Sequence, residues 1–339
     1  MNLQVLQQLK KDLGEPKNIV ITTHKNPDGD AMGSSLGLYN YLILLKHKVT
    51  VITPNDYPDF LNWLSGNNKV VVFEHKRKKA EELVATADIV FCLDFNSLKR
   101  IEELGDVIRD SKAFKIVIDH HQEPEHFADI LYSKPHESST CQMVFDFIEL
   151  LGDKHLINKS IANCLYTGIM TDTGSFRFPS TTSKTHHTIA QLIEAGAENA
   201  AIYDYVNDNN TESKLRLLGY CLSEKLKIFE EYDTAFFALS KEDLTRFNYK
   251  NGDTEGVVNF ALSISGIKFA AFFSEKEDLI RISFRSKGNF QVNDFSKKHF
   301  NGGGHHNAAG GMSEVSLDET ISKFISLLPQ YKDLILNSK

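Results

Sequence analysis

The chain has 339 residues with a hydrophobic fraction of 41%, and this length favours two domains, because single hydrophobic cores stop growing at about 250–300 residues. Its net charge of -7 excludes the global positive field that would recruit long duplex nucleic acid. The sequence contains no apolar run of the ~18 residues that a membrane span needs, no signal-peptide pattern and no closely spaced cysteines, so we expect a cytoplasmic protein with reduced thiols.

The first half alternates apolar, β-branched runs with helical patterns. The predicted elements are, in chain order, a strand at 18–24, a helix at 33–47, strands at 48–54 and 87–95, a short helix at 98–104 and a strand at 113–121. Continuous apolar strands separated by helices are typical of a parallel sheet that is covered on both faces. We therefore expect an α/β fold whose N-terminal domain has a parallel sheet with flanking helices.

The second half changes character twice. Helical patterns occupy 139–152, 160–174, 182–196 and 198–229, and strand-like runs follow at 233–240, 267–275 and 279–287, with a helix at 254–265. This predicts three parts: an N-terminal domain at 1–195, a helical linker at 196–230, and a smaller C-terminal α/β domain with a mixed sheet at 231–339.

Acids and histidines recur where the predicted strands of the first half end. They are His24, Asp28, Asp30, Asp94, Asp119, His120, His121 and, in a helix-to-loop segment, Asp172. Ligands of open parallel sheets bind outside the carboxyl ends of the strands, so we expect these side chains to meet in one crevice. A single aspartate at such a position is commonly a helix cap or a turn former, but the recurrence at successive elements favours a shared site.

The residue types in this set indicate a metal site. Mixed carboxylate and imidazole ligands suit Mn²⁺, Fe²⁺ or Zn²⁺, whereas Mg²⁺ and Ca²⁺ prefer shells made of oxygen alone. The set is too large for one ion. Two ions ~3.5–4 Å apart, bridged by one carboxylate, would use it and would clamp an in-line phosphoryl displacement.

The motifs HKNPDGDA, LDF, DHH and TGIMTDTGSF, in this order, resemble the four motifs of the DHH phosphoesterase superfamily. That superfamily includes RecJ exonuclease, family II inorganic pyrophosphatase and the bacterial nanoRNase/pAp phosphatases. The segment GGGHHNAAGG at 302–311 resembles the hallmark of the DHH-associated C-terminal domain. The resemblance spans essentially the whole chain. The size of the chain and its two-domain layout are most similar to the nanoRNase/pAp phosphatase branch.

The resemblance implies a role for each residue at the strand ends. One metal would be bound by His24, Asp28 and Asp94, and the second by Asp30, Asp94, His120 and Asp172, with Mn²⁺ as the expected ion. A water or hydroxide between the ions would be the nucleophile. His121 would lie close to the scissile phosphate, and Asp119 would fix a ring tautomer behind the histidines.

The glycine-rich segment is neither a dinucleotide fingerprint nor a P-loop, because it lacks both the spacing and the Lys-Ser/Thr pair. The resemblance implies that Gly303, Gly304 and His305 face the substrate and that Arg285 helps to hold the terminal phosphate or the base of a nucleotide. We expect Ala308-Ala309 to open a short helix that attracts an anion. The polar run at 138–140 precedes a predicted helix, and the sequence does not decide whether it caps that helix or binds phosphate.

These observations predict a metal-dependent phosphoesterase. The resemblance implies that it hydrolyses short oligoribonucleotides such as nanoRNA and pApA to mononucleotides, and also pAp to AMP, and by analogy it could form a homodimer. A phosphodiesterase for cyclic di-AMP or linear dinucleotides and an exopolyphosphatase are alternatives that the sequence does not separate. A non-catalytic nucleotide sensor is disfavoured because every expected ligand is present, and a dinucleotide-binding dehydrogenase fails for lack of G-x-G-x-x-G.

Overall fold

The computed structural model describes residues 3–208, 210–277 and 279–338. The chain divides into two compact units, Met1–Asn209 and Asn210–Lys339. Within the described ranges, every helix is too short or too polar to cross a lipid bilayer.

The first unit is built on a six-stranded sheet in the order β3-β2-β1-β4-β5-β6. All neighbouring strands in it are parallel, which confirms the predicted parallel sheet. Its helices and strands are α1 (Leu3–Asp12), β1 (Asn18–Thr23), α2 (Gly29–Leu44), β2 (Lys48–Thr53), β3 (Val71–Val72), α3 (Phe73–Ala85), β4 (Ile89–Leu93), α4 (Glu103–Asp110), β5 (Phe114–Asp119), β6 (Ile130–Ser133), α5 (Thr140–Leu150), α6 (Lys159–Asp172), α7 (Ser183–Glu194) and α8 (Asn199–Asn207).

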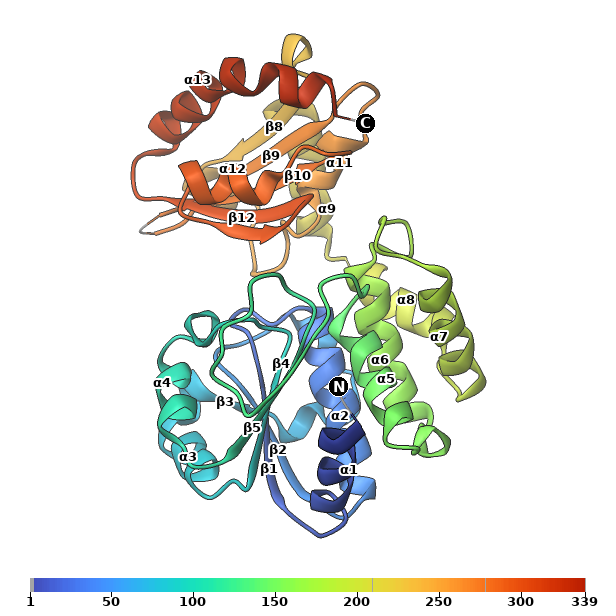
Figure 1. The fold of residues 1–339 in the computed structure, drawn as a ribbon. Helices are drawn as coiled ribbons and strands as arrows, with labels where there is room; N and C mark the ends of the chain where they lie inside the picture. Colours follow the sequence, from blue (N-terminus) through green and yellow to red (C-terminus); the bar gives the residue numbers. More distant parts are fainter. Residues whose placement is uncertain (1–2, 209, 278, 339) are drawn as a thin grey trace. The chain divides into compact units, whose positions relative to one another are not determined.

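Both faces of this sheet are covered, as the continuous apolar strands predict. Alternate strand residues such as Ile21 and Phe91 belong to the core formed with α2, α5 and α6. Their neighbours Val20 and Val90 belong to a second core formed with α3 and α4. Figure 1 shows these two groups of helices on opposite sides of the strands. The sheet is therefore a rigid central layer from which loops extend at its edge.

Three features of the first unit differ from the sequence prediction. The helix expected at 33–47 begins at Gly29, because the side chain of Asp28 caps it. The short strands β3 and β6 were not expected. Nor was α3, whose sequence FEHKRKKAEELVA buries only Phe73, Ala80 and Val84 and so has a weak apolar periodicity.

The second unit contains a six-stranded sheet in the order β11-β12-β10-β9-β8-β7. The β8–β9 pair is parallel and the other pairs are antiparallel, which confirms the predicted mixed sheet. Rings of Phe269, Phe284 and Phe324 meet in its core with centroid distances of 5.5 to 6.2 Å. Its elements are α9 (Glu212–Tyr220), β7 (Lys227–Phe229), β8 (Thr234–Leu239), α10 (Lys241–Arg246), α11 (Val257–Ser263), β9 (Phe269–Glu275), β10 (Ile280–Ser286), α12 (Val292–His299), β11 (Gly303–His305), β12 (Ala308–Ser313) and α13 (Leu317–Leu336).

The strand order of the first unit creates a natural binding position. Strands β1 and β4 are neighbours in the sheet, yet the chain leaves β1 toward α2 on one face and β4 toward α4 on the other. A crevice forms where successive connections diverge in this way, at the carboxyl ends of the two strands. His24 and Asp94 are the residues that follow β1 and β4.

Helices α2 and α6 approach each other closely through small residues. A Cβ atom at Gly33 would lie 2.5 Å from the Cys164 carbonyl oxygen, and one at Gly168 would lie 2.8 Å from an Asp30 carboxylate oxygen. Both positions therefore require glycine. The close packing brings Asp30, near the start of α2, beside the helix that ends in Asp172.

We expect Gly33→Ala to lower the free energy of unfolding by about 1–3 kcal/mol, because the added methyl group overpacks a contact with backbone. Gly219→Ala is the matched control, since Gly219 lies in α9 with no atom within 4 Å of an added Cβ. The control should stabilise slightly, through the higher helix propensity of alanine. Urea denaturation followed by circular dichroism checks both, and a Gly33→Ala variant as stable as the native chain would show that the helices are packed more loosely.

Candidate functional site

His24, Asp28 and Asp94 form a first cluster at the carboxyl ends of β1 and β4. The Nδ1 atom of His24 lies 2.8 Å from the Lys25 carbonyl oxygen, to which it can only donate. The other ring nitrogen, Nε2, lies 3.8 Å from Asp28 Oδ2 and 3.4 Å from Asp94 Oδ2. A backbone carbonyl that fixes the tautomer in this way leaves the Nε2 lone pair directed at the two carboxylates, as in metal-binding histidines.

Asp30, His120 and Asp172 form a second cluster of the same kind. The Nδ1 atom of His120 donates to the Glu137 carbonyl oxygen at 3.2 Å. Its Nε2 atom lies 3.9 Å from Asp30 Oδ2 and 3.4 Å from Asp172 Oδ2. Both histidines thus present Nε2 to acidic groups. In each cluster the potential ligand atoms lie within 4.8 Å of one another, close enough to hold one cation.

Asp94 lies between the two clusters and faces both. Its Oδ2 atom is the one near His24, whereas its Oδ1 atom lies 3.6 Å from His120 Nε2. The residue is 2% exposed, and its backbone has a φ of 64°. This left-handed conformation is uncommon outside glycine, although aspartate tolerates it, and such outliers concentrate at functional sites. Asp94 is placed as a bridging carboxylate would be.

Two helix N-termini position the acids of α2. The Oδ1 atom of Asp28 accepts hydrogen bonds from the N–H groups of Asp30 and Ala31, both at 3.0 Å, so the residue caps α2. The Asp30 carboxylate in turn accepts N–H bonds from Thr140 at 2.6 Å and Cys141 at 2.8 Å, in the first turn of α5. Amides at a helix N-terminus favour negative charge, so these two hydrogen bonds fix the orientation of the Asp30 carboxylate.

Asp119 and His121 form a pair beside the clusters. Asp119 Oδ1 accepts a hydrogen bond from His121 Nδ1 at 2.7 Å, and Asp119 is 0% exposed. A carboxylate behind an imidazole fixes its tautomer and makes Nε2, across the ring, the nitrogen that can meet another group. The structure places both residues next to the acids, with His121 held by Asp119 and its Nδ1 atom 3.7 Å from Asp94 Oδ1.

The electrostatics of the site call for positive charge. Burial raises the pKa of Asp30 well above its usual range, and the charges of Asp94 and Asp172 raise it further. For His120, burial opposes protonation, but the carboxylates of Asp94 and Asp30 outweigh it and raise the pKa. Packed acids of this kind need protons or a cation. Donor atoms of a common ion with bonds of 2.0–2.2 Å lie ~3–4 Å apart, which matches the distances observed here.

The remaining predicted residues lie in the second unit. Arg285 on β10 pairs with Ala308 on β12, and Ala308 pairs with His305 on β11. Residues directly opposite in neighbouring strands point to the same face, so Arg285 and His305 share a face with the small Ala308 between them. Arg285 also donates through Nη1 to the Phe284 carbonyl oxygen at 2.9 Å.

The prediction that a helix opens at Ala308-Ala309 is wrong, because these residues begin strand β12. The glycine-rich segment folds into a β11–β12 hairpin, and Ala309 is buried against the phenylalanine core. Gly304 has a φ of 142°, and a Cβ there would lie 2.5 Å from the Ala308 carbonyl oxygen. Close strand pairing is thus one reason why glycine stands at this position.

Thr140 belongs to the run at 138–140 that the sequence offers as a helix cap or a phosphate site, but its contacts with the acids of the site were not expected. Its hydroxyl donates to Asp94 Oδ1 at 3.0 Å, and its N–H is one of the two that bind Asp30. Ser139, the preceding residue, is the helix cap and accepts the Gln142 N–H at 3.0 Å. The sequence contains only a polar run before a helix, and the acids that Thr140 contacts lie far away along the chain.

We expect Thr140→Val to weaken divalent-metal affinity by about 10–100-fold, the usual cost of removing a hydrogen-bond partner of a metal ligand. Valine keeps the shape and the backbone N–H but removes the hydroxyl that orients Asp94. Thr140→Ser is the control, because it retains the donor. Titration calorimetry with Mn²⁺ measures the affinity directly, and equal affinities for the valine and serine variants would show that the hydroxyl has no orienting role.

Two segments of the chain match known domain families: 18–169 matches the DHH family, N-terminal domain, and 234–331 matches the DHHA1 domain. The bifunctional oligoribonuclease and PAP phosphatase NrnA of Thermus thermophilus is 32% identical over 91% of this chain and 88% of its own length. The Bacillus subtilis protein of the same description is 29% identical over 89% and 90%. An exopolyphosphatase-related protein of Bacteroides fragilis has a solved structure that is 41% identical, covers 98% of both chains and superposes with a TM-score of 0.93. The chain therefore belongs to the DHH family, with a DHHA1 domain in its C-terminal part.

Proposed function

We propose that this protein is a metal-dependent phosphoesterase that hydrolyses short oligoribonucleotides to mononucleotides and pAp to AMP. The observation that carries the proposal is the pair of imidazole and carboxylate clusters that share Asp94. Support for the substrate class comes from the Thermus thermophilus and Bacillus subtilis relatives, which are described as oligoribonucleases and PAP phosphatases.

Two divalent ions, with Mn²⁺ as the preferred metal, are part of this proposal. The assigned ligands are His24, Asp28 and Asp94 for the first ion, and Asp30, Asp94, His120 and Asp172 for the second. The chemistry that such a pair supplies is neutralisation of phosphoryl oxygens and a lowered pKa for a nearby water. Imidazole ligands in both clusters favour Mn²⁺ over Mg²⁺, which prefers oxygen ligands.

The chain's own groups have separate tasks in this proposal. His121, held at Nδ1 by Asp119, directs Nε2 to an oxygen of the scissile phosphate and donates a hydrogen bond as charge develops there. In the protonated imidazole both ring nitrogens donate, and Asp119 accepts from Nδ1 and stabilises the positive charge. Burial of Asp94, His120 and Asp119 excludes bulk water from one side of the reacting group, which strengthens each of these interactions.

Residues of the second unit are proposed to bind the substrate. Arg285 offers a planar guanidinium that can pair with two oxygens of one phosphate, a geometry that a lysine lacks. His305 lies on the same face of the sheet, and Gly303 and Gly304 allow a ligand to approach the backbone closely. These four residues would hold part of the nucleotide that is not being cleaved.

A parallel assay with Mn²⁺ tests the proposed function. The substrates are pApA, a short RNA of about five nucleotides, a long RNA of about 24 nucleotides, pAp, cyclic di-AMP and polyphosphate. We expect rapid conversion of pApA, the short RNA and pAp, with the long RNA spared. Preference for cyclic di-AMP would favour a signalling phosphodiesterase, and preference for polyphosphate would favour the activity named in the Bacteroides fragilis description. Inactivity on all six would contradict an enzymatic role.

A further inference from the structure

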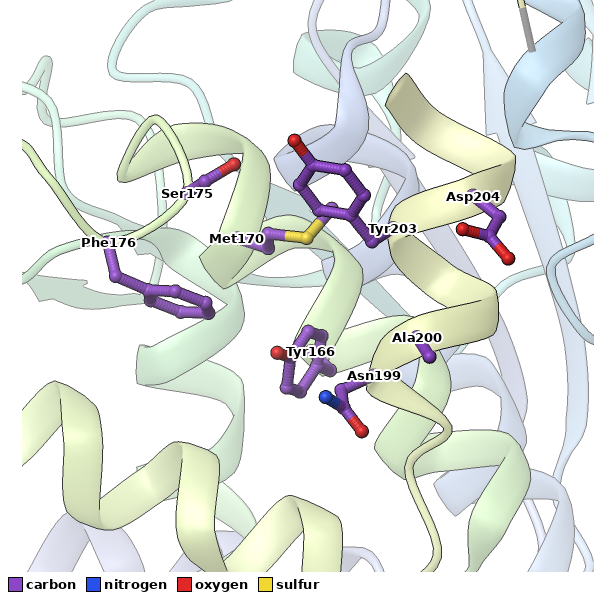
Figure 2. Close-up of a pocket in the computed structure, with 8 residues that line it drawn as sticks. All are labelled: Tyr166, Met170, Ser175, Phe176, Asn199, Ala200, Tyr203 and Asp204. Atoms are coloured by element: carbon purple, nitrogen blue, oxygen red, sulfur yellow. The ribbon is translucent and has the colours of Figure 1, made fainter. Parts of the chain in front are cut away.

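A pocket of about 450 Å³ lies within the first unit, between α6, the loop that follows it, and α8 (Figure 2). Tyr166 and Met170 of α6 are 5% and 2% exposed and form its floor, whereas Tyr203 of α8 is 45% exposed at its edge. The lining residues are Tyr166, Met170, Ser175, Phe176, Asn199, Ala200, Tyr203 and Asp204. A volume of this size is typical of small-ligand sites.

The lining suits a flat aromatic ligand. Figure 2 shows the rings of Tyr166, Phe176 and Tyr203 around the cavity, and the first two meet edge to face at a centroid distance of 5.9 Å. The side chains of Asn199 and Ser175 are exposed at the pocket, so their polar groups are accessible to a ligand. An amide supplies both a donor and an acceptor, which is the pattern that base edges present.

The charge of the lining argues against a phosphate. The lining contains an acid, Asp204, and no lysine or arginine. A phosphate group would therefore meet negative charge without a cationic partner. A neutral planar group that stacks on aromatic rings and bonds to an amide fits the same walls, as nucleobases do in single-stranded RNA recognition.

The loop that supplies Ser175 and Phe176 is held in an uncommon conformation. Gly174, Ser175 and Phe176 have φ values of 56°, 59° and 68°. Bulky residues rarely adopt positive φ, and such strain persists only where surrounding contacts enforce it. Thr173 does so here: its hydroxyl accepts the Phe176 N–H at 3.1 Å, and its carbonyl accepts the N–H groups of Arg177 and Phe178. The pocket wall is therefore preformed.

The pocket and the candidate metal centre share helix α6, which ends at Asp172. Ser175 follows only three residues later, so its Cα lies at most about 11 Å from that of Asp172. We propose that this pocket binds one nucleobase of the short oligoribonucleotide whose phosphodiester is cleaved at the metal centre. The assignment rests on the proposed function and adds a base subsite within the first unit.

The test uses pApA that carries 2-aminopurine in place of adenine, a base whose fluorescence is quenched when it stacks. The full-length protein is titrated in EDTA, so that no turnover occurs. We expect saturable quenching that Tyr203→Ala weakens by about 5–100-fold, the range for loss of one stacking ring. Tyr205→Ala is the matched control, because Tyr205 lies on the same helix, is 46% exposed and stacks on Trp63 instead. It should change the affinity by less than about twofold.

A second variant, Asn199→Ala, removes the amide at an exposed position and should also weaken binding while melting normally. Equal affinities of the native chain, Tyr203→Ala and Asn199→Ala, or no saturable quenching, would overturn the subsite. Quenching that responds to Tyr203→Ala in a protein that hydrolyses none of the substrates would sink the proposed function and leave the base site in place. Normal hydrolysis with a KM unchanged by Tyr203→Ala would support the proposed function and contradict the base subsite.

Discussion

Asp94→Asn is expected to lower kcat by about 10³-fold or more and to reduce the number of Mn²⁺ ions that bind. Asp94 has one oxygen near His24 of the first cluster and the other near His120 of the second, so losing its charge weakens both clusters at once. Asparagine has nearly the same shape and, like aspartate, tolerates the left-handed backbone observed at this position. The substitution thus changes the charge with little effect on the local fold, which an alanine there would not achieve.

Asp88→Asn provides the matched control for Asp94. Asp88 is exposed just before the other end of β4, where its carboxylate accepts the Asn18 N–H at 2.8 Å. This control should keep native turnover and native metal stoichiometry. Steady-state kinetics on pApA and calorimetric titration with Mn²⁺ give the two readouts. An Asp94→Asn variant that binds two ions and turns over within tenfold of the native rate would refute the shared-carboxylate assignment.

His121→Gln is expected to lower kcat by about 10²–10⁴-fold, the usual contribution of a positioned proton donor. Metal affinity should change far less, because His121 Nδ1 is engaged by Asp119 and lies 3.7 Å from Asp94 Oδ1. The variant therefore separates the hydrogen bond to the substrate from the binding of ions. A fall in kcat with unchanged Mn²⁺ titration is the signature that distinguishes His121 from His24 and His120.

His126→Gln makes the same chemical change in the exposed loop after β5 and should leave kinetics unaltered. If His121→Gln instead lost Mn²⁺ affinity in proportion to its activity, His121 would be a metal ligand and its assignment would have to change. Full activity of the variant would remove it from the reaction altogether.

Much of the site could be predicted because several of its residues directly follow apolar strands that the sequence pattern locates. Apolar β-branched runs locate β1, β4 and β5, and the polar residue that follows each run marks its carboxyl end. Parallel strands present those ends at one edge of the sheet, so His24, Asp94 and His120 could be expected to meet before their distances were known.

The remaining features depend on contacts between segments that are distant in sequence. Thr140 binds Asp30 and Asp94 across 110 and 46 residues. The close approach of α2 and α6 through Gly33 and Gly168 is a property of the packed pair and has no signal in either helix alone. The helix propensity of Ala308-Ala309 predicts a helix start, whereas the structure has the β11–β12 hairpin there, because burial of Ala309 against the core overrides that propensity.

The most direct test of this account is a crystal structure with Mn²⁺, measured at the manganese absorption edge. We expect two anomalous peaks ~3.5–4 Å apart, one among His24, Asp28 and Asp94, the other among Asp30, His120 and Asp172, with Asp94 between them. A single peak, or peaks away from the carboxyl ends of β1 and β4, would contradict the two-ion site on which the proposed hydrolysis depends.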